Sequence, residues 1–183
     1  MQTHQLTPHP LFSPQCVRSV EAKLGIVGHW LQLRWRVEGS AKVVLPPFTG
    51  RQRRDELWRT TCFELFVKPT NGQAYAEFNF APSEAWAAYD FTSWREGASE
   101  RAISHDPVIT PRAGRDLLIM DVAIPLSDLP GPASLRPDIS MTAVIEEEGG
   151  HISYWAMAHG DPGKPDFHDP ACFAAKLAPP EAP

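Results

Sequence analysis

Two short segments decide the fold of this chain: Cys62-Phe-Glu-Leu-Phe-Val67 and Tyr75-Ala-Glu-Phe-Asn-Phe80. Apolar side chains recur at every second position, which is the period of a strand whose side chains point to alternate faces. Between them lies Pro69-Thr-Asn-Gly72, whose Asn-Gly pair favours a tight hairpin turn. The sequence therefore predicts two antiparallel strands with one apolar face. The side chains expected in the core are Phe63, Leu65, Phe78 and Phe80.

The same alternation extends outward in both directions. Residues 19–26 and 30–37 predict a second hairpin around Gly28, with Leu31, Leu33 and Trp35 in the core. Further strands are expected at 42–45, 85–91, 117–125, 139–145, 152–158 and 172–177, with a short helical turn capped by Ser127 after Pro125. About nine or ten short strands separated by turns predict an all-β fold, an antiparallel β-sandwich of jelly-roll or immunoglobulin-like type.

Length and composition indicate one domain. The chain has 183 residues, of which 43% are hydrophobic, enough to bury a core without metal or disulfide staples. We expect a flexible N-terminal segment at residues 1–15, a ligand-binding β-sandwich at 16–178 and a frayed tail at 179–183. Cys16, Cys62 and Cys172 are an odd, widely spaced set, which predicts reduced and mostly buried thiols.

Charge and hydropathy exclude several function classes. The net charge is −5, and the one dense basic cluster, Arg51–Arg54, is followed at once by Asp55 and Glu56, so no nucleic-acid partner is expected. No apolar run approaches the roughly 18 residues that a membrane span requires, so no membrane association is expected. The first 15 residues lack a basic start and an apolar segment, and we expect a cytoplasmic protein.

Motifs of the common enzyme classes are absent from the sequence. It contains no Gly-rich phosphate loop, no Gly-x-Ser-x-Gly elbow, no zinc-type cysteine pair and no His-Glu-x-x-His. Composition and motifs therefore favour a binding domain over an enzyme.

Four sequence features together carry a family resemblance. They are the Trp-containing loop before Cys62, the strand Cys62-Phe-Glu-Leu-Phe, the return strand Tyr75-Ala-Glu-Phe-Asn, and the late segment Pro165-Asp-Phe-His-Asp-Pro170. Over about residues 16–178 the chain resembles the DOMON-like superfamily, which includes cytochrome-type haem-binding domains and family-nine carbohydrate-binding modules. The resemblance implies a jelly-roll-like sandwich that holds a sugar or a haem.

Polar side chains on the two deciding strands form the first candidate site. Glu64 shares a face with apolar neighbours, and Glu77 and Asn79 share a face of the partner strand. Across the strands, these three groups could line a concave face and hold the hydroxyls of a ligand. The alternative is that they are ordinary outward residues of a sheet with one solvated face.

Tryptophans in loops form the second candidate. Trp58, beside Arg59, could stack on the apolar face of a sugar ring while Arg59 fixes a polar edge, and Trp94 lies in a similar loop position. The alternative is that each indole closes one end of the sandwich, which is the more frequent fate in a domain with six tryptophans.

The segment from Trp155 to Asp169 is the third candidate. His159, Lys164, Asp166 and His168 lie in a Pro- and Gly-rich loop that could present them to a ligand. By the resemblance, His168 could ligate haem iron opposite a methionine such as Met157. Asp161, Asp166 and Asp169 could instead hold calcium. The alternative is a turn-rich connection whose polar groups bond to their own backbone.

Three functions therefore compete on the sequence. The first is a non-catalytic domain that binds a carbohydrate or a sugar-derived ligand. The second is a haem-binding electron-transfer domain. The third is a hydrolase-type enzyme that uses His159, Asp166 and His168 for acid–base chemistry, and it ranks last because no nucleophile is paired with a base.

Overall fold

The computed structural model describes residues 1–179, and within them the chain forms strands and short 3-10 helices. The strands are β1 (Gln2–Pro8), β2 (Ser19–Val27), β3 (Trp30–Glu38), β4 (Cys62–Lys68), β5 (Tyr75–Phe80), β6 (Trp86–Phe91), β7 (Ser99–Glu100), β8 (Val108–Ala113), β9 (Leu117–Pro125), β10 (Asp138–Glu147), β11 (His151–Ala156) and β12 (Ala175–Lys176). The 3-10 helices are η1 (Ser40–Lys42), η2 (Leu57–Arg59), η3 (Leu126–Asp128), η4 (Ala133–Leu135) and η5 (Pro170–Cys172).

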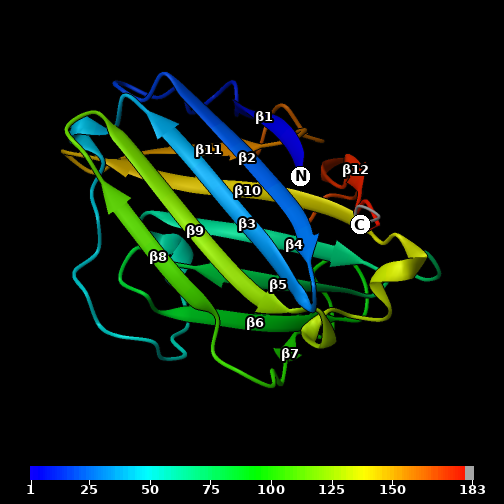
Figure 1. Cartoon of the computed structure of the whole chain (residues 1–183). Coiled ribbons are helices and arrows are strands. Elements are labelled where there is room, and N and C mark those ends of the chain that lie inside the picture. Colours follow the sequence, from blue (N-terminus) through cyan, green and yellow to red (C-terminus); the bar gives the residue numbers. More distant parts are fainter. Residues whose placement is uncertain (180–183) are drawn as a thin grey trace.

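These strands make two layers, as the sequence predicted (Figure 1). The strand order is β7-β6-β5-β4-β10-β11-β1-β2-β3-β9-β8, with β12 beside β10, and every pairing between named strands is antiparallel. In Figure 1 the layer β8-β9-β3-β2 crosses in front of the layer that contains β11, β10, β4, β5 and β6. The all-β antiparallel sandwich is therefore confirmed.

The N-terminal strand joins the two layers. Gln2 to Leu6 pair with β2 in the front layer, while Thr7 and Pro8 pair with β11 in the other layer. The expectation of a flexible segment at residues 1–15 therefore does not hold over β1, because backbone pairing on both sides orders it. The tail expected at 179–183 lies outside the described residues except for Pro179.

The core fills the space between the layers. Trp35 of β3 reaches across to Phe63 and Phe80, with ring centroids 5.5 and 6.2 Å apart. The core side chains predicted from the sequence are all buried: Leu31, Leu33, Trp35, Phe63, Leu65, Phe78 and Phe80. The two predicted hairpins are also present, because β4 pairs with β5 and β2 with β3.

Some local predictions were wrong. Residues 42–45 form no strand, since η1 ends at Lys42 and only Val43 makes an isolated bridge to Glu147. Ser127 caps nothing, because η3 begins after Pro125 and has no side-chain cap. In the stretch 172–177, the η5 helix and the two-residue strand β12 replace the predicted strand.

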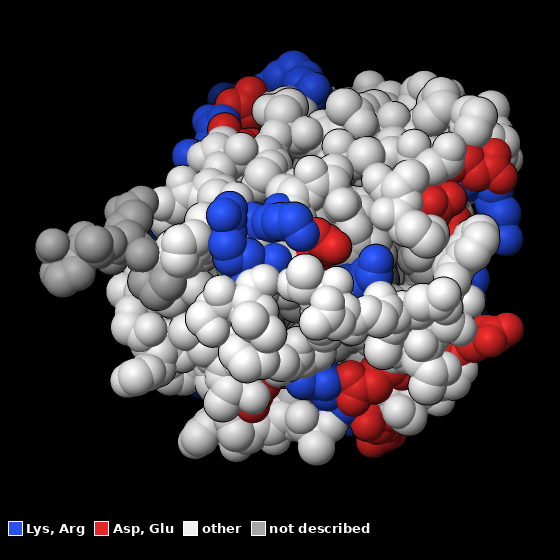
Figure 2. Space-filling model, turned by 90° about the vertical axis from the view of Figure 1, so that its right-hand side faces the viewer, with Lys and Arg blue, Asp and Glu red and all other residues white. Residues whose placement is uncertain are grey.

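Charges at the end of the sandwich that carries β12 are mixed. Figure 2 shows that the basic side chains on this face lie beside acidic ones or in small groups. At this end Lys176 of β12 contacts Asp138 of β10, with Nζ 2.6 Å from Oδ1. No helix formed by residues 1–179 is long and apolar enough to cross a membrane.

Candidate functional site

The outer face of β4, β5, β6 and β10 is buried although it points away from the core. In β4 and β5 every residue from Cys62 to Val67 and from Tyr75 to Phe80 is buried, so both faces of these strands are covered. The cover on the outer face consists of three connections, around Trp58, around Arg95 and around Phe167, which all contribute to one cavity. The half-solvated sheet that was one reading of the sequence is therefore not present here.

The cavity has a volume of about 380 Å³. Binding sites for small molecules commonly have volumes of this order. Its lining comes from the outer face and from the three covering connections: Trp58, Glu64, Phe66, Glu77, Tyr89, Phe91, Arg95, Ala98, Val144, Tyr154, Pro165, Phe167 and His168. Six of these thirteen residues are Phe, Tyr or Trp, and His168 adds a seventh ring. The walls therefore consist mostly of ring faces and edges.

Ring contacts hold the walls of the cavity in place. Phe91 stacks on Tyr75 with centroids 4.9 Å apart and planes within 7°. His168 stands edge-on to both Phe66 and Phe91, at 5.2 and 4.9 Å. Such contacts add to the free energy of apolar burial and fix ring orientations. The walls are therefore formed before any ligand arrives.

Polar groups on the strands form the floor. In the strand register Glu64 lies opposite Asn79 on β5 and opposite Thr142 on β10. Thr142 Oγ1 donates a hydrogen bond to Glu64 Oε2 at 2.8 Å, and Asn79 Nδ2 donates to Glu77 Oε1 at 2.7 Å. Asn79 Oδ1 is buried without a hydrogen-bond partner among the described residues. The floor thus presents two carboxyl groups to the cavity, and among residues 1–179 the other Arg, Lys, Asp, Glu or His side chains that line it are Arg95 and His168.

Burial sets the protonation of the two carboxyl groups. It raises the pKa of Glu64 above its ordinary value, and the nearby charge of Glu77 raises it further. Burial likewise raises the pKa of Glu77, although the hydrogen bond from Asn79 and the charge of Arg95 act in the opposite direction. The pair therefore holds protons at pH values at which an exposed glutamate has lost its own.

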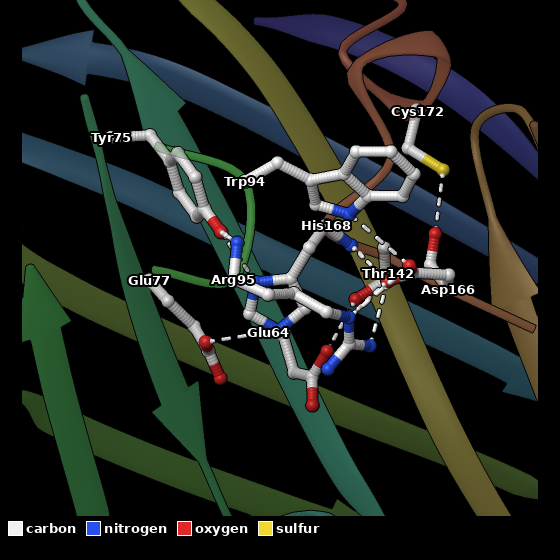
Figure 3. A network of polar contacts seen from close by, with 9 residues as sticks. All are labelled: Glu64, Tyr75, Glu77, Trp94, Arg95, Thr142, Asp166, His168 and Cys172. Carbon is white, nitrogen blue, oxygen red and sulfur yellow. Dashed lines mark hydrogen bonds and ion pairs between the residues drawn. The ribbon is translucent and has the colours of Figure 1, made fainter. Parts of the chain in front are cut away.

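A chain of polar contacts connects Glu77 to Tyr75 through His168 (Figure 3). The Tyr75 hydroxyl accepts the Arg95 backbone N–H at 3.2 Å, so its own proton is free to donate to His168 Nδ1 at 2.7 Å. The other ring nitrogen, Nε2, then carries the proton and faces Glu77 Oε2 at 3.5 Å. Burial and the Arg95 charge lower the pKa of His168 to about 4, so the ring is neutral at pH 7.

Asp166 joins two of the covering connections. Its carboxylate accepts from Arg95 Nε at 3.0 Å and Nη2 at 2.6 Å, from Trp94 Nε1 at 3.2 Å and from the His168 backbone N–H at 3.0 Å. Burial by itself would raise the pKa of Asp166, but the Arg95 hydrogen bonds and charge lower it overall. Arg95 has a left-handed backbone, with φ of 56°, which is uncommon for a residue with a side chain. This tight turn directs both the indole and the guanidinium onto Asp166 (Figure 3).

The structure brings only some of the predicted site residues together. Trp58, Glu64, Glu77 and His168 line the cavity. Asn79 and Asp166 do not line it, but each binds a residue that does: Asn79 donates a hydrogen bond to Glu77, and Asp166 accepts hydrogen bonds from Arg95.

The other four predicted residues lie elsewhere. Trp155 is buried in the main core on the opposite face of the sheet, where Nε1 donates to Ser153 Oγ at 2.9 Å. Arg59 is exposed and contacts Glu56, and Lys164 is exposed as well. His159 contacts the Thr7 carbonyl oxygen and the His9 ring. Strand alternation could have separated Trp155 from its neighbour Tyr154, which does line the cavity.

Sequence reasoning missed several members of the cavity. Alternation assigns Phe66, Tyr89 and Phe91 to the outer face, because they share a face with the glutamates of the floor. This alternation can be read from the sequence, but it is equally compatible with an outer face that packs as a second apolar surface without a cavity. Arg95 could not be found this way, because its place depends on the fold of a loop.

The residues present do not fit a haem or a calcium ion. Both ring nitrogens of His168 face protein groups, and Met157 Sδ accepts the Met141 backbone N–H at 3.2 Å while packing against the main core. Asp161 and Asp169 accept backbone N–H groups within their own turns, from Gly163 and Ala171. No three metal-ligating side chains gather at one point within residues 1–179.

Comparison with known proteins bears on the fold. No protein-family model matches the chain, and no curated protein matches it. The crystal structure of a candidate carbohydrate-binding protein from Bacteroides uniformis is similar with a TM-score of 0.64 and 16% identity, covering 96% of this chain and 85% of that one. A family-nine carbohydrate-binding module from Caldicellulosiruptor kristjanssonii, solved with glucose, gives a TM-score of 0.45 and 11% identity over 85% of this chain and 75% of that one.

At these identities the first similarity concerns the β-sandwich fold, and the second is too distant to carry an argument. Membership of the DOMON-like superfamily stays a prediction.

Proposed function

We propose that this protein binds a carbohydrate in the cavity on the outer face of β4, β5, β6 and β10. The observation that carries the proposal is the combination of aromatic walls with a floor of hydrogen-bonding groups in one preformed space of about 380 Å³. Sugars present apolar C–H faces and polar hydroxyl edges. A site for them therefore needs ring faces beside donors and acceptors.

The walls would take the apolar face of the sugar. Trp58 is the aromatic wall residue that is most open to solvent, with 42% of its surface exposed, and it stands edge-on to Tyr89 at 6.3 Å. A sugar that enters past Trp58 would cover this exposed indole. Burial of that apolar surface would supply much of the free energy of binding.

The floor would take the hydroxyl groups. Glu64 lines the cavity, and the described residues donate a hydrogen bond to its Oε2 but none to its Oε1. Because burial raises the pKa of both glutamates, each can donate as an acid or accept as a carboxylate. Hydroxyl groups likewise donate and accept, so the floor suits a ligand that has several of them.

The shared fold of the Bacteroides uniformis protein also supports a carbohydrate ligand, since that protein is described as a candidate carbohydrate-binding protein. The support is indirect, because a fold can carry many functions and the ligand is decided by the site. The haem alternative has neither a fitting ligand set nor a supporting relative.

The test is isothermal titration calorimetry with glucose, cellobiose, glucosamine and N-acetylglucosamine, on the parent protein and on Glu77→Gln. We expect at least one sugar to bind, and Glu77→Gln to weaken it on the order of tenfold, because a buried hydrogen-bonding partner is altered. Glu148→Gln, at an exposed position in the β10–β11 turn, is the matched control. If no sugar binds the parent, or if both variants bind like it, the proposal is wrong.

One observation favours a second candidate, hydrolysis of a glycosidic bond. Two carboxyl groups with raised pKa values face one cavity, and such pairs serve as acid and base in glycoside hydrolases. Incubation of the protein with cellobiose, followed by proton NMR, distinguishes the two. Appearance of glucose that Glu64→Gln abolishes would establish the enzyme, and unchanged cellobiose would leave the binding function.

A further inference from the structure

We infer that the cavity selects a sugar that carries a protonated amine, an amino sugar, over its neutral counterparts. This inference rests on the proposed function, because it concerns the ligand of the same site. The observation behind it is that two buried carboxyl groups, Glu64 and Glu77, line the cavity and form no ion pair with a Lys or Arg side chain of residues 1–179.

The cations near the floor are already committed. Arg95 lines the cavity, but Asp166 binds its guanidinium through Nε and Nη2, and the side chain of Asp166 is only 8% exposed. His168 faces Glu77, but burial and the charge of Arg95 lower its pKa to about 4, so its ring is neutral at pH 7. No Lys or Arg within residues 1–179 forms an ion pair with Glu64 or Glu77.

The other acidic groups around the cavity have partners of their own. Asp55 accepts a hydrogen bond from the Tyr89 hydroxyl at 2.6 Å, and Glu56 pairs with Arg59 at 2.7 Å. The carboxyl groups that line the cavity itself are the two in the floor, and neither has a Lys or Arg partner among the described residues. Buried carboxylates without a counter-ion are costly, and the chain lowers this cost by keeping them protonated.

An ammonium group from the ligand would complete the floor. It donates up to three hydrogen bonds, and the bonds it could make to Glu64 Oε1 and to Glu77 Oε2 are charge-assisted. The walls suit the same ligand, because Phe66, Phe91 and Tyr154 line the cavity and aromatic faces attract cations. A neutral hydroxyl in the same place would make neither charge-assisted hydrogen bonds to the glutamates nor cation–π contacts with the aromatic walls.

Binding of such a cation has a proton signature. The carboxyl pair holds protons in the free protein, and an ammonium group favours the ionised form, so a proton must leave the pair when the cation binds. Binding of a neutral sugar makes no such demand. The two kinds of ligand therefore differ in proton release as well as in affinity.

The experiment compares glucosamine, glucose and N-acetylglucosamine by calorimetry at pH 6.5, below the ordinary pKa of an α-amino group. N-acetylglucosamine has the same ring as glucosamine but no charge. We expect glucosamine to bind on the order of tenfold more tightly than glucose or N-acetylglucosamine, because it adds a charge-assisted hydrogen bond. Titrations in phosphate and in Tris, which differ in ionisation enthalpy, should show proton release with glucosamine and none with glucose.

Glu64→Gln and Glu77→Gln should remove the preference and the proton release, while Glu148→Gln should keep both. Glucose binding without a preference for glucosamine would overturn the inference and leave the proposed function standing. Failure of all three sugars to bind the folded parent would overturn both. A preference that survives in both floor variants would also overturn the inference. The comparison of sugars on the parent protein needs no variant and holds even if a floor variant fails to fold.

Discussion

The two faces of β4 and β5 are equally buried but are buried in different ways. On the inner face Phe63, Leu65, Phe78 and Phe80 interlock with the front layer around Trp35. On the outer face the same strands carry carboxyl, amide and phenol groups under three loop connections that leave a cavity of about 380 Å³.

The difference shows what each face is for. The inner face contains only apolar groups in close contact, which stabilises the fold and leaves no space for a ligand. The outer face buries polar groups around an empty space, which costs stability unless something fills it. Natural chains keep such arrangements where they bind other molecules, so fold stability and ligand binding should depend on different faces of the same two strands.

The largest expected effect is on the inner face. Phe63→Ala should lower the free energy of unfolding by about 3–5 kcal/mol, because it removes a fully buried ring from the core. Phe91→Ala, which removes a partly exposed ring from the outer face, should cost less than half as much. Urea denaturation followed by circular dichroism measures both. Equal losses would show that the outer face also belongs to the stabilising core.

The next largest effect is on binding. Trp58→Ala should weaken sugar binding by about 1–3 kcal/mol, because a stacking surface is lost, and should leave the unfolding free energy nearly unchanged. Trp30→Ala is the matched control, since Trp30 is 40% exposed and begins β3 in the other layer. Calorimetry measures the sugar affinity of both variants against that of the parent. A loss of affinity in Trp30→Ala alone would place the ligand on the wrong layer for this account.

The carboxyl pair gives the outer face a pH dependence that the inner face lacks. Because the folded-state pKa values of Glu64 and Glu77 are raised, the folded state holds more protons than the unfolded state above pH 4.5, and stability falls as pH rises. His168 has a lowered pKa and opposes this change only up to its ordinary value of 6.5. Above pH 6.5 the deprotonation of Glu64 and Glu77 lowers the stability, and His168 no longer offsets this loss.

Between pH 6.5 and 8 the parent should therefore lose roughly 1–2 kcal/mol of stability. Glu64→Gln should flatten this decline, since an amide does not titrate. Thermal unfolding at several pH values measures the slope, with Glu148→Gln as the control. A parent whose stability rises over this range would contradict the raised pKa values.

The smallest expected effects belong to two residues that the sequence placed in the site. Arg59→Ala and Lys164→Ala should each change both stability and sugar affinity by less than about 0.5 kcal/mol, because these side chains are exposed and do not line the cavity. Calorimetry and thermal unfolding on the two variants measure this. A tenfold loss of affinity in either one would extend the site beyond the cavity.

The fold could be predicted from the sequence because strand alternation is a local signal. The strand 117–125 and the two hairpins 19–37 and 62–80 are present, and the predicted core residues are buried. The strand β1 was missed because its alternation is polar, and its order comes from pairing with both layers.

The site could be predicted only in part, for the same reason. Glu64, Glu77 and Asn79 follow from alternation on strands. The roles of Arg95 and Asp166 depend on two loops, 71 residues apart in sequence, that meet over the sheet. Trp155 was assigned to the site through its dense surroundings, but its strand position points it into the core. Loop geometry leaves no periodic pattern in a sequence, so only the folded chain reveals it.

The most direct test follows the tryptophan indole N–H signals by proton–nitrogen NMR during a titration with glucosamine or glucose. The central claim is that the ligand enters the outer-face cavity, so we expect the Trp58 signal to move with ligand concentration. The Trp35 and Trp155 signals, from the core between the two layers, should stay where they are. A ligand that binds while the Trp58 signal stays unchanged, or that moves the Trp30 signal instead, would contradict the claim.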